Sequence, residues 1–173
     1  MPAITIAAML TIGFLLILVV LLICMRLRSS MKLLAALGVL GGMAAFFGAF
    51  YLLRIPLDTA LQTLKQSNPA MYRFGTTLYA PITEEPAKWL VLIPFFLAGK
   101  INHENKTVWA ICIGIGFGMG EIVFLSQRIA ADPQTLTMPW YLSSGFMVER
   151  FMVSLIHSAL VLIAVDALCS RKL

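Results

Sequence analysis

Residues 4–25 read ITIAAMLTIGFLLILVVLLICM, without a single charged side chain. A helix that crosses the hydrocarbon core of a bilayer needs about 20 mainly apolar residues, so this stretch predicts a membrane-spanning helix. A signal peptide would have a basic start, a shorter apolar core and a small-residue cleavage site, and the stretch shows none of them. We therefore expect this helix to be retained in the protein.

The chain as a whole has the composition of a membrane protein. Of its 173 residues, 60% are hydrophobic and only 12% are charged, whereas soluble domains have about 25% charged residues. The mean hydropathy is +0.92. These values exclude an ordinary soluble domain and a disordered chain. The net charge is +5, but the basic residues stand in small groups between apolar runs, so nucleic acid is not an expected partner.

Four further apolar runs predict the rest of the fold. They cover residues 31–53, 74–98, 107 to about 124 and about 146 to 168. Residues 54–73, between the second and third runs, are amphipathic with leucines at helical spacing, which predicts a short interfacial helix. No internal repeat divides the chain. We predict one all-α integral-membrane domain over residues 1–173, a polytopic bundle of about five spanning helices with its functional core in residues 74–168.

Basic residues in short connections predict the orientation, because they tend to stay on the cytoplasmic side. With the N-terminus outside, the cytoplasmic side receives Arg26, Arg28, Lys32, Lys100, Lys106, Arg171 and Lys172. The other side receives Arg54, Lys65, Arg73 and Arg128. We therefore expect the N-terminus outside and the C-terminus in the cytoplasm.

Ionisable residues inside the apolar runs are the strongest functional signal. Glu84, Glu85, Lys88, Glu121 and His157 all interrupt such runs, and each costs about 2.5–3.5 kcal/mol at a helix centre unless it is compensated. With a rise of about 1.5 Å per residue, they lie at levels roughly 10–17 Å below the outer surface. We therefore expect side chains from three helices to meet in one pocket that opens outward.

The spacing of these charges predicts how they are compensated. Lys88 follows Glu85 by three residues and Glu84 by four, so it can reach either carboxylate on one helix face. One lysine cannot neutralise both of these and Glu121 as well. Further compensation must come from a proton or from one of the remaining groups: Arg150, a protonated His157 or a metal cation.

The run before Glu121 predicts close helix packing. Residues 114–121 read GIGFGMGE, and glycines four residues apart let membrane helices approach closely. The spacing does not fit the dinucleotide-binding fingerprint, and no soluble strand precedes it. Packing explains the glycines but not the carboxylate that follows them.

Three motifs follow one another on separate apolar runs. They are Glu84-Glu85-Pro86-Ala87-Lys88, Gly116-Phe117-Gly118-Met119-Gly120-Glu121, and Glu149-Arg150 followed by His157. The ordered set resembles that of the PrsW family, a relative of the CAAX prenyl endopeptidases and bacteriocin-processing (CPBP) membrane proteins. The resemblance spans about residues 83–157. It implies an intramembrane endopeptidase of the bacterial cell membrane, one that cuts the extracytoplasmic part of a single-span anti-sigma factor.

The chain departs from the prenyl-endopeptidase pattern at three places. That pattern has an arginine where Lys88-Trp89 stands and a histidine where Glu121 stands. It also has an asparagine or aspartate at the position of Val161. These differences favour the PrsW branch and argue against a prenylated substrate.

The chemistry of peptide hydrolysis assigns roles to the same residues. The reaction needs an activated water, a stabilised oxyanion and a proton for the leaving amine. Glu84 or Glu85 is the candidate general base, and the other carboxylate is a ligand or an orienting group. Lys88 and Arg150 are candidates to fix the carboxylates or to stabilise the oxyanion.

A metal is the open question in this mechanism. Glu121 and His157, together with Glu85, either hold a divalent metal or position the water directly. Glutamate and histidine donors suit zinc, which lowers the pKa of a bound water to about 7. Without a metal, a glutamate and a histidine share the activation of water.

Two function classes fit these residues. The first is the endopeptidase, with the lipid bilayer and a single-span membrane protein as partners. The second is a non-enzymatic membrane carrier or binding protein in which buried Glu, Lys and His form a proton or ion relay. In a cell lacking the chain, the enzyme predicts uncut single-span proteins, and the carrier predicts altered ion or solute flux.

Overall fold

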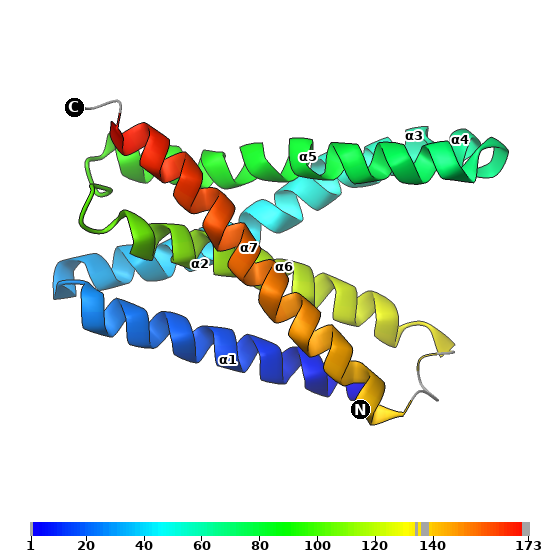
Figure 1. Cartoon of the computed structure of the whole chain (residues 1–173), viewed down its shortest axis with the longest axis horizontal. Helices are drawn as coiled ribbons and strands as arrows, with labels where there is room; N and C mark the ends of the chain where they lie inside the picture. Colours follow the sequence, from blue (N-terminus) through cyan, green and yellow to red (C-terminus); the bar gives the residue numbers. More distant parts are fainter. Residues whose placement is uncertain (1, 134, 136–138, 171–173) are drawn as a thin grey trace.

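The fold is an all-α bundle, as the sequence predicts. The computed structural model describes residues 2–133, 135 and 139–170, and this part of the chain is helical almost throughout and contains no strand. Its long helices are α1 (Ala3–Arg26), α2 (Ser29–Ala49), α5 (Pro69–Leu97), α6 (Lys106–Ala130) and α7 (Ser143–Ser170). Successive long helices run in opposite directions, so their connections alternate between the two ends of the bundle (Figure 1).

Four stretches are long and apolar enough to cross a membrane. They are Ala3–Arg26, Met31–Ala60, Lys106–Ala130 and Ser143–Ser170. Helix α5 has 29 residues and a length of about 43 Å, which exceeds the roughly 30 Å of a hydrocarbon core. Helix α5 is not among the four stretches, and it contains four charged residues, one more than α6 or α7: Arg73, Glu84, Glu85 and Lys88.

Short elements join α2 to α5. They are η1 (Phe50–Arg54), which is a π-helical turn, α3 (Ile55–Ala60) and α4 (Gln62–Ser67). A single turn of 3₁₀ helix, η3 (Trp140–Leu142), precedes α7. In Figure 1, α3 and α4 lie beside the first half of α5.

The segment 54–73 differs from the separate interfacial helix that its composition predicts. Its first residues continue the helix of α2 as far as Ala60, and only α4 is a separate short helix. Pro56 has no N–H for an α-helical bond. The π turn widens the helix just before it, where the N–H of Ile55 bonds the carbonyl of Phe50. The helix therefore passes the proline instead of ending there.

Two helices also extend beyond the apolar runs that predict them. Helix α5 begins at Pro69 because the side chain of Asn68 caps it, accepting a bond of 3.1 Å from the N–H of Met71. Helix α6 continues to Ala130, so Glu121 lies inside the helix and not near its end.

The basic residues of the predicted cytoplasmic side lie mostly at one end of the bundle. Arg171 and Lys172 are outside the described residues. The other five lie on or beside the ends of α1 and α5 and the starts of α2 and α6, which meet on the left in Figure 1. One of them, Lys106, forms an ion pair with Asp166 and ties the start of α6 to the end of α7.

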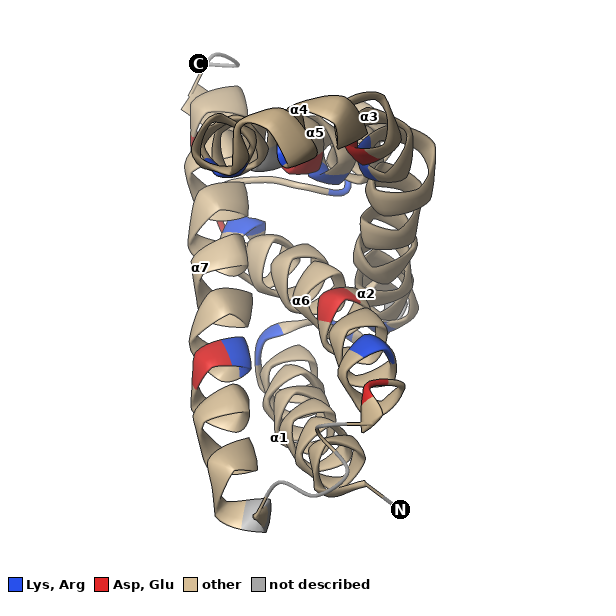
Figure 2. Cartoon of the chain, turned by 90° about the vertical axis from the view of Figure 1, so that its right-hand side faces the viewer, with Lys and Arg blue, Asp and Glu red and all other residues tan. Residues whose placement is uncertain are grey.

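Helix α6 occupies the centre of the bundle, and its glycines explain how it fits there. Figure 2 shows α6 between α2 and α7, with α1 on one side and the layer of α3, α4 and α5 on the other. A Cβ atom at Gly114 would clash with the backbone of Ser158 in α7, and one at Gly116 would clash with the carbonyl of Val39 in α2. The glycines thus bring the α6 backbone against helices on two faces, which confirms the predicted close packing.

Replacing Gly116 with alanine is expected to lower the free energy of unfolding by about 1–3 kcal/mol, the range for overpacking a closed interface. The opposing atom is a backbone carbonyl, which cannot move without displacing α2. Gly48→Ala is the matched control, because a Cβ there meets no atom within 4 Å. Unfolding of both variants in detergent gives the comparison, and equal stability of the two would contradict the packing argument.

Candidate functional site

The site begins with two residues of α5 that lie one turn apart. Lys88 donates a hydrogen bond of 2.7 Å from its Nζ to Oε1 of Glu85. The side chain of Lys88 is only 1% exposed, whereas that of Glu85 is 29% exposed. The lysine is therefore the buried member of the pair, and the carboxylate reaches the surface of the bundle.

Lys88 also connects α5 to α6 and α7. Its Nζ lies 2.9 Å from Nδ1 of His157 in α7 and 4.5 Å from the centre of the Phe117 ring in α6. The ring of His157 packs edge-on against the same phenylalanine, with 4.8 Å between the ring centroids. Because an ammonium group only donates, Nδ1 must accept, and the proton of the neutral imidazole is on Nε2.

Glu121 lies on the other side of the histidine ring. Nε2 of His157 faces Oε2 of Glu121 at 3.5 Å, a long hydrogen bond. Oε1 of Glu121 pairs with Arg150 at 2.9 Å, and Arg150 also bonds Glu149 at 2.5 Å. One polar chain therefore runs from Glu85 through Lys88, His157 and Glu121 to Arg150.

Glu84 has a partner that the sequence interpretation missed. Oε1 of Glu84 accepts a hydrogen bond of 2.8 Å from Arg54, which is the last residue of the π turn. Such turns are frequent at functional sites, but here the turn becomes visible only in the structure. The sequence signal for Arg54 was its position directly after an apolar run.

Each of the three carboxylates therefore has its own basic partner. Arg54 pairs with Glu84, Lys88 with Glu85 and Arg150 with Glu121. This arrangement supplies the compensation that one lysine could not provide. Figure 2 shows charged segments of both signs on the side of the α3 and α5 layer that faces the rest of the bundle.

Glu85 opens onto a cavity of ≈ 540 Å³ on α5. The other lining residues are Pro86, Trp89, Leu90 and Ile93, and Leu90 is 73% exposed. All five lining residues belong to α5, so the cavity is an open hollow on the outer face of that helix. The Glu85 carboxylate is the ionisable group of its lining.

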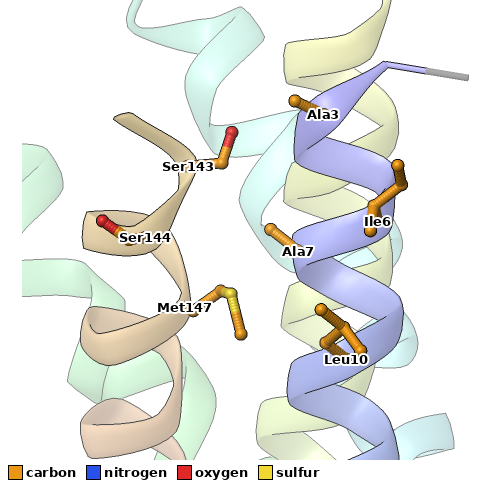
Figure 3. A pocket seen from close by; sticks show the side chains of 7 residues that line it. All are labelled: Ala3, Ile6, Ala7, Leu10, Ser143, Ser144 and Met147. Atoms are coloured by element: carbon orange, nitrogen blue, oxygen red, sulfur yellow. The ribbon is translucent and has the colours of Figure 1, made fainter. Parts of the chain in front are cut away.

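A second cavity has no such group. It has a volume of ≈ 280 Å³ and lies between α1, from Ala3 to Leu10, and α7, from Ser143 to Met147 (Figure 3). Its lining consists of alanine, isoleucine, leucine, methionine and serine side chains. This cavity has no acid or base that could take part in hydrolysis.

The predicted metal ligands do not converge on one point. Glu85 lies on the Nδ1 side of His157, behind the ammonium of Lys88, and Glu121 faces Nε2. Within residues 2–133, 135 and 139–170, no three His, Cys, Asp or Glu side chains are arranged to hold a metal ion. The set of Glu85, Glu121 and His157 therefore does not fit a metal as arranged.

The structure thus connects five of the predicted site residues in one chain: Glu85, Lys88, Glu121, Arg150 and His157. The contacts across α5, α6 and α7 agree with the common depth estimated from the sequence. Glu84 belongs to a separate ion pair. Phe117, which lies beneath both Lys88 and His157, was part of a quoted motif but had no predicted role.

Comparison with known proteins identifies a family. No curated protein and no solved structure matches the chain significantly. A model of the PrsW family of intramembrane metalloproteases matches residues 29–164, which include all five residues of the polar chain and Arg54. This match covers most of the sequence and favours the enzyme over the carrier. The chain belongs to the PrsW family of intramembrane metalloproteases.

Proposed function

We propose that the protein hydrolyses a peptide bond in a single-span membrane protein, such as an anti-sigma factor, with Glu85 as the general base. The observation that carries this proposal is the place of Glu85, which lines an open, mainly apolar hollow on α5 while a buried lysine holds its carboxylate. A substrate helix can reach such a cavity by moving sideways in the bilayer. Family membership supports the reaction class.

In this mechanism a water molecule in the cavity gives a proton to Glu85 and attacks the carbonyl carbon of the peptide bond. The protonated Glu85 then gives that proton to the leaving amine. The apolar neighbours Pro86, Trp89 and Leu90 keep bulk water away, which strengthens the interaction of the carboxylate with the attacking water. Glu84 is less suited to this role because it does not line this cavity and its side chain is only 15% exposed, against 29% for Glu85.

The remaining groups act through Glu85. Lys88 is too deeply buried to meet a substrate, and it orients one oxygen of Glu85. His157 accepts from Lys88, and Glu121 with Arg150 holds the histidine from its other side. We therefore assign these four as positioning residues for the base.

The setting of the reaction is part of the same proposal. We place the N-terminus outside, the C-terminus in the cytoplasm and the cut on the extracytoplasmic side of a bacterial cell membrane. The count of basic residues and the PrsW resemblance support this orientation. The motif order also supports a distant relationship to the CPBP proteins.

The proposal is tested by labelling new protein N-termini in membranes of cells that express the chain and of cells that do not. We expect new termini in one or a few single-span proteins, close to the outer end of their spans. Purified chain and the same substrate in liposomes should reproduce the cut. Unchanged termini together with altered ion flux in those liposomes would replace the enzyme by the carrier.

The metal is tested by elemental mass spectrometry on the active, detergent-purified chain. The arrangement of Glu85, Lys88 and His157 predicts activity without stoichiometric zinc. Zinc that is bound at about one ion per chain and lost in the Glu121→Gln/His157→Ala variant would place a metal between α6 and α7. That result would replace the mechanism above by metal-assisted hydrolysis.

A further inference from the structure

A separate cavity lies at the end of the bundle where α1 meets α2. It has a volume of ≈ 410 Å³ and is formed by the α1–α2 turn and the α5–α6 loop. Its polar lining consists of Arg26, Arg28, Lys100, Asn102, Glu104 and Asn105. None of these residues takes part in the polar chain around Glu85.

The charge of this cavity is unbalanced. It has three cationic side chains, those of Arg26, Arg28 and Lys100, and one carboxylate, that of Glu104. In the described part of the chain, none of the three cations forms an ion pair. Two positive charges therefore remain for a ligand, and the cations come from two segments that are distant in the sequence.

The α5–α6 loop is held in place by its own hydrogen bonds. Helix α5 ends at Leu97, and the positive φ of 68° at Gly99 allows the Schellman bonds from Gly99 to Phe96 and from Lys100 to Phe95. The Asn105 side chain then binds the backbone at both Asn102 and Lys100. Lys100 is therefore presented from an ordered backbone.

The first backbone N–H groups of two helices at the cavity also favour an anion. Helix α2 begins directly after Arg28, and α6 begins directly after Asn105. Neither helix has a side-chain cap on its first N–H groups. Uncapped N–H groups at a helix start carry partial positive charge, so these backbone groups have the same sign as the three cations.

The position of the cavity points to a lipid. Arg26 ends one membrane span and Lys106 begins another, which places the cavity at the level of the phosphates at the bilayer surface. Apolar residues adjoin the charged groups: Leu27 and Met31 line the cavity, and Met25 and Leu33 beside it are 78% and 71% exposed. A phosphate with attached acyl chains matches both the cationic side chains and the apolar residues beside them.

We propose that this cavity binds the phosphate of an anionic glycerophospholipid, with Arg28 and Lys100 as its two principal contacts. Because cations outnumber carboxylates in the cavity, it favours a headgroup in which no amine cancels the negative charge of the phosphate. Basic clusters at the cytoplasmic surface attract anionic lipids in this way. The inference is independent of the peptidase site, which lies in the middle of α5 and α7.

Lysine acetylation of the full wild-type chain in micelles tests this proposal without any variant. Phosphatidylglycerol is expected to protect Lys100 from the reagent and to leave the exposed Lys65 reactive, whereas phosphatidylcholine with the same acyl chains protects neither. Equal protection of both lysines, or equal protection by both lipids, would overturn the proposal. Protection of Lys100 by inorganic phosphate alone would assign the site to a soluble phosphate and would also overturn it.

Matched variants give the affinity. In native mass spectrometry, Arg28→Gln/Lys100→Gln is expected to weaken phosphatidylglycerol binding by about 10- to 30-fold. The control Lys65→Gln/Arg73→Gln removes the same charge from exposed residues in α4 and at the start of α5, at the opposite end of the bundle (Figure 1), and a change below about twofold is expected. Similar weakening in both variants would show attraction by net charge only and would contradict the assigned cavity.

Discussion

Replacing Glu85 with glutamine is expected to lower the rate of peptide cleavage by about 10²- to 10⁴-fold, the usual contribution of a general base. The amide has nearly the same shape but cannot take a proton from water, while its oxygen can still accept from Lys88. Lys88 keeps the amide oxygen and Nδ1 of His157 as acceptors but loses its counter-charge, so the fold should persist with a lower free energy of unfolding. The rate of cutting of a single-span substrate in liposomes measures the effect, with thermal unfolding as the check on folding.

Two variants make this result specific. Glu84→Gln makes the same change one residue away, where the carboxylate is engaged by Arg54, and a loss below about tenfold is expected because the base remains. Asp132→Asn removes a carboxylate beyond the end of α6 and should leave the rate unchanged. A Glu84→Gln loss as large as that of Glu85→Gln would move the role of base to Glu84.

The same assay separates a positioning role of His157 from a structural one. His157→Ala is expected to stop cleavage, because Lys88 loses the acceptor that holds it. His157→Gln should recover part of the rate, since an amide can accept from Lys88 and donate to Glu121 at once. Full activity in His157→Ala would remove the histidine from the mechanism.

Replacing Lys88 with methionine is expected to have the largest effect on stability, about 3 kcal/mol, near the low end for breaking a buried pair. Glu85 and His157 would both lose their hydrogen-bond donor, and the remaining exposure of Glu85 limits the cost. The free energy of unfolding in mixed detergent micelles measures the change.

A double variant identifies the cause of that loss. Lys88→Met/Glu85→Gln removes the charge that the single variant leaves alone, and its stability should return to within about 1 kcal/mol of the wild type. Lys106→Met is the control, because its partner Asp166 is exposed and exposed ion pairs contribute little. A Lys88→Met effect no larger than this control would contradict the proposed role.

The sequence predicts a helix end best where the apolar run and the helical backbone hydrogen bonds end at the same residue. Residues 4–25 predict α1 to within one residue at each end because Pro2 and Arg26 bound an uninterrupted apolar run. The end of α6 differs because Leu125, Gln127 and Arg128 are good helix formers after the apolar run has ended. Hydropathy indicates where a chain enters lipid, whereas a helix ends where its backbone bonds stop.

The site, too, has contacts that the sequence predicts and contacts that it does not. The meeting of Glu85, Lys88, Glu121 and His157 follows from their common depth on three helices, which residue counting estimates. The pairing of Glu84 with Arg54 does not, because it depends on a π turn that no hydrophobic pattern indicates. Residue counting also does not show that Phe117 supports both Lys88 and His157, since that contact depends on the rotation of α6 about its axis.

The glycines of α6 have a consequence for how this protein can diverge. Because bare backbone faces α2 and α7, α6 acts as a spacer of nearly the minimum thickness that a helix can have. Larger residues at Gly114 and Gly116 would widen the bundle and draw the histidine of α7 away from the lysine of α5. Substitutions are therefore tolerated least at Gly114 and Gly116, which carry no functional group. These two glycines set the distance between the reactive side chains of α5 and α7 although they have no side chain themselves.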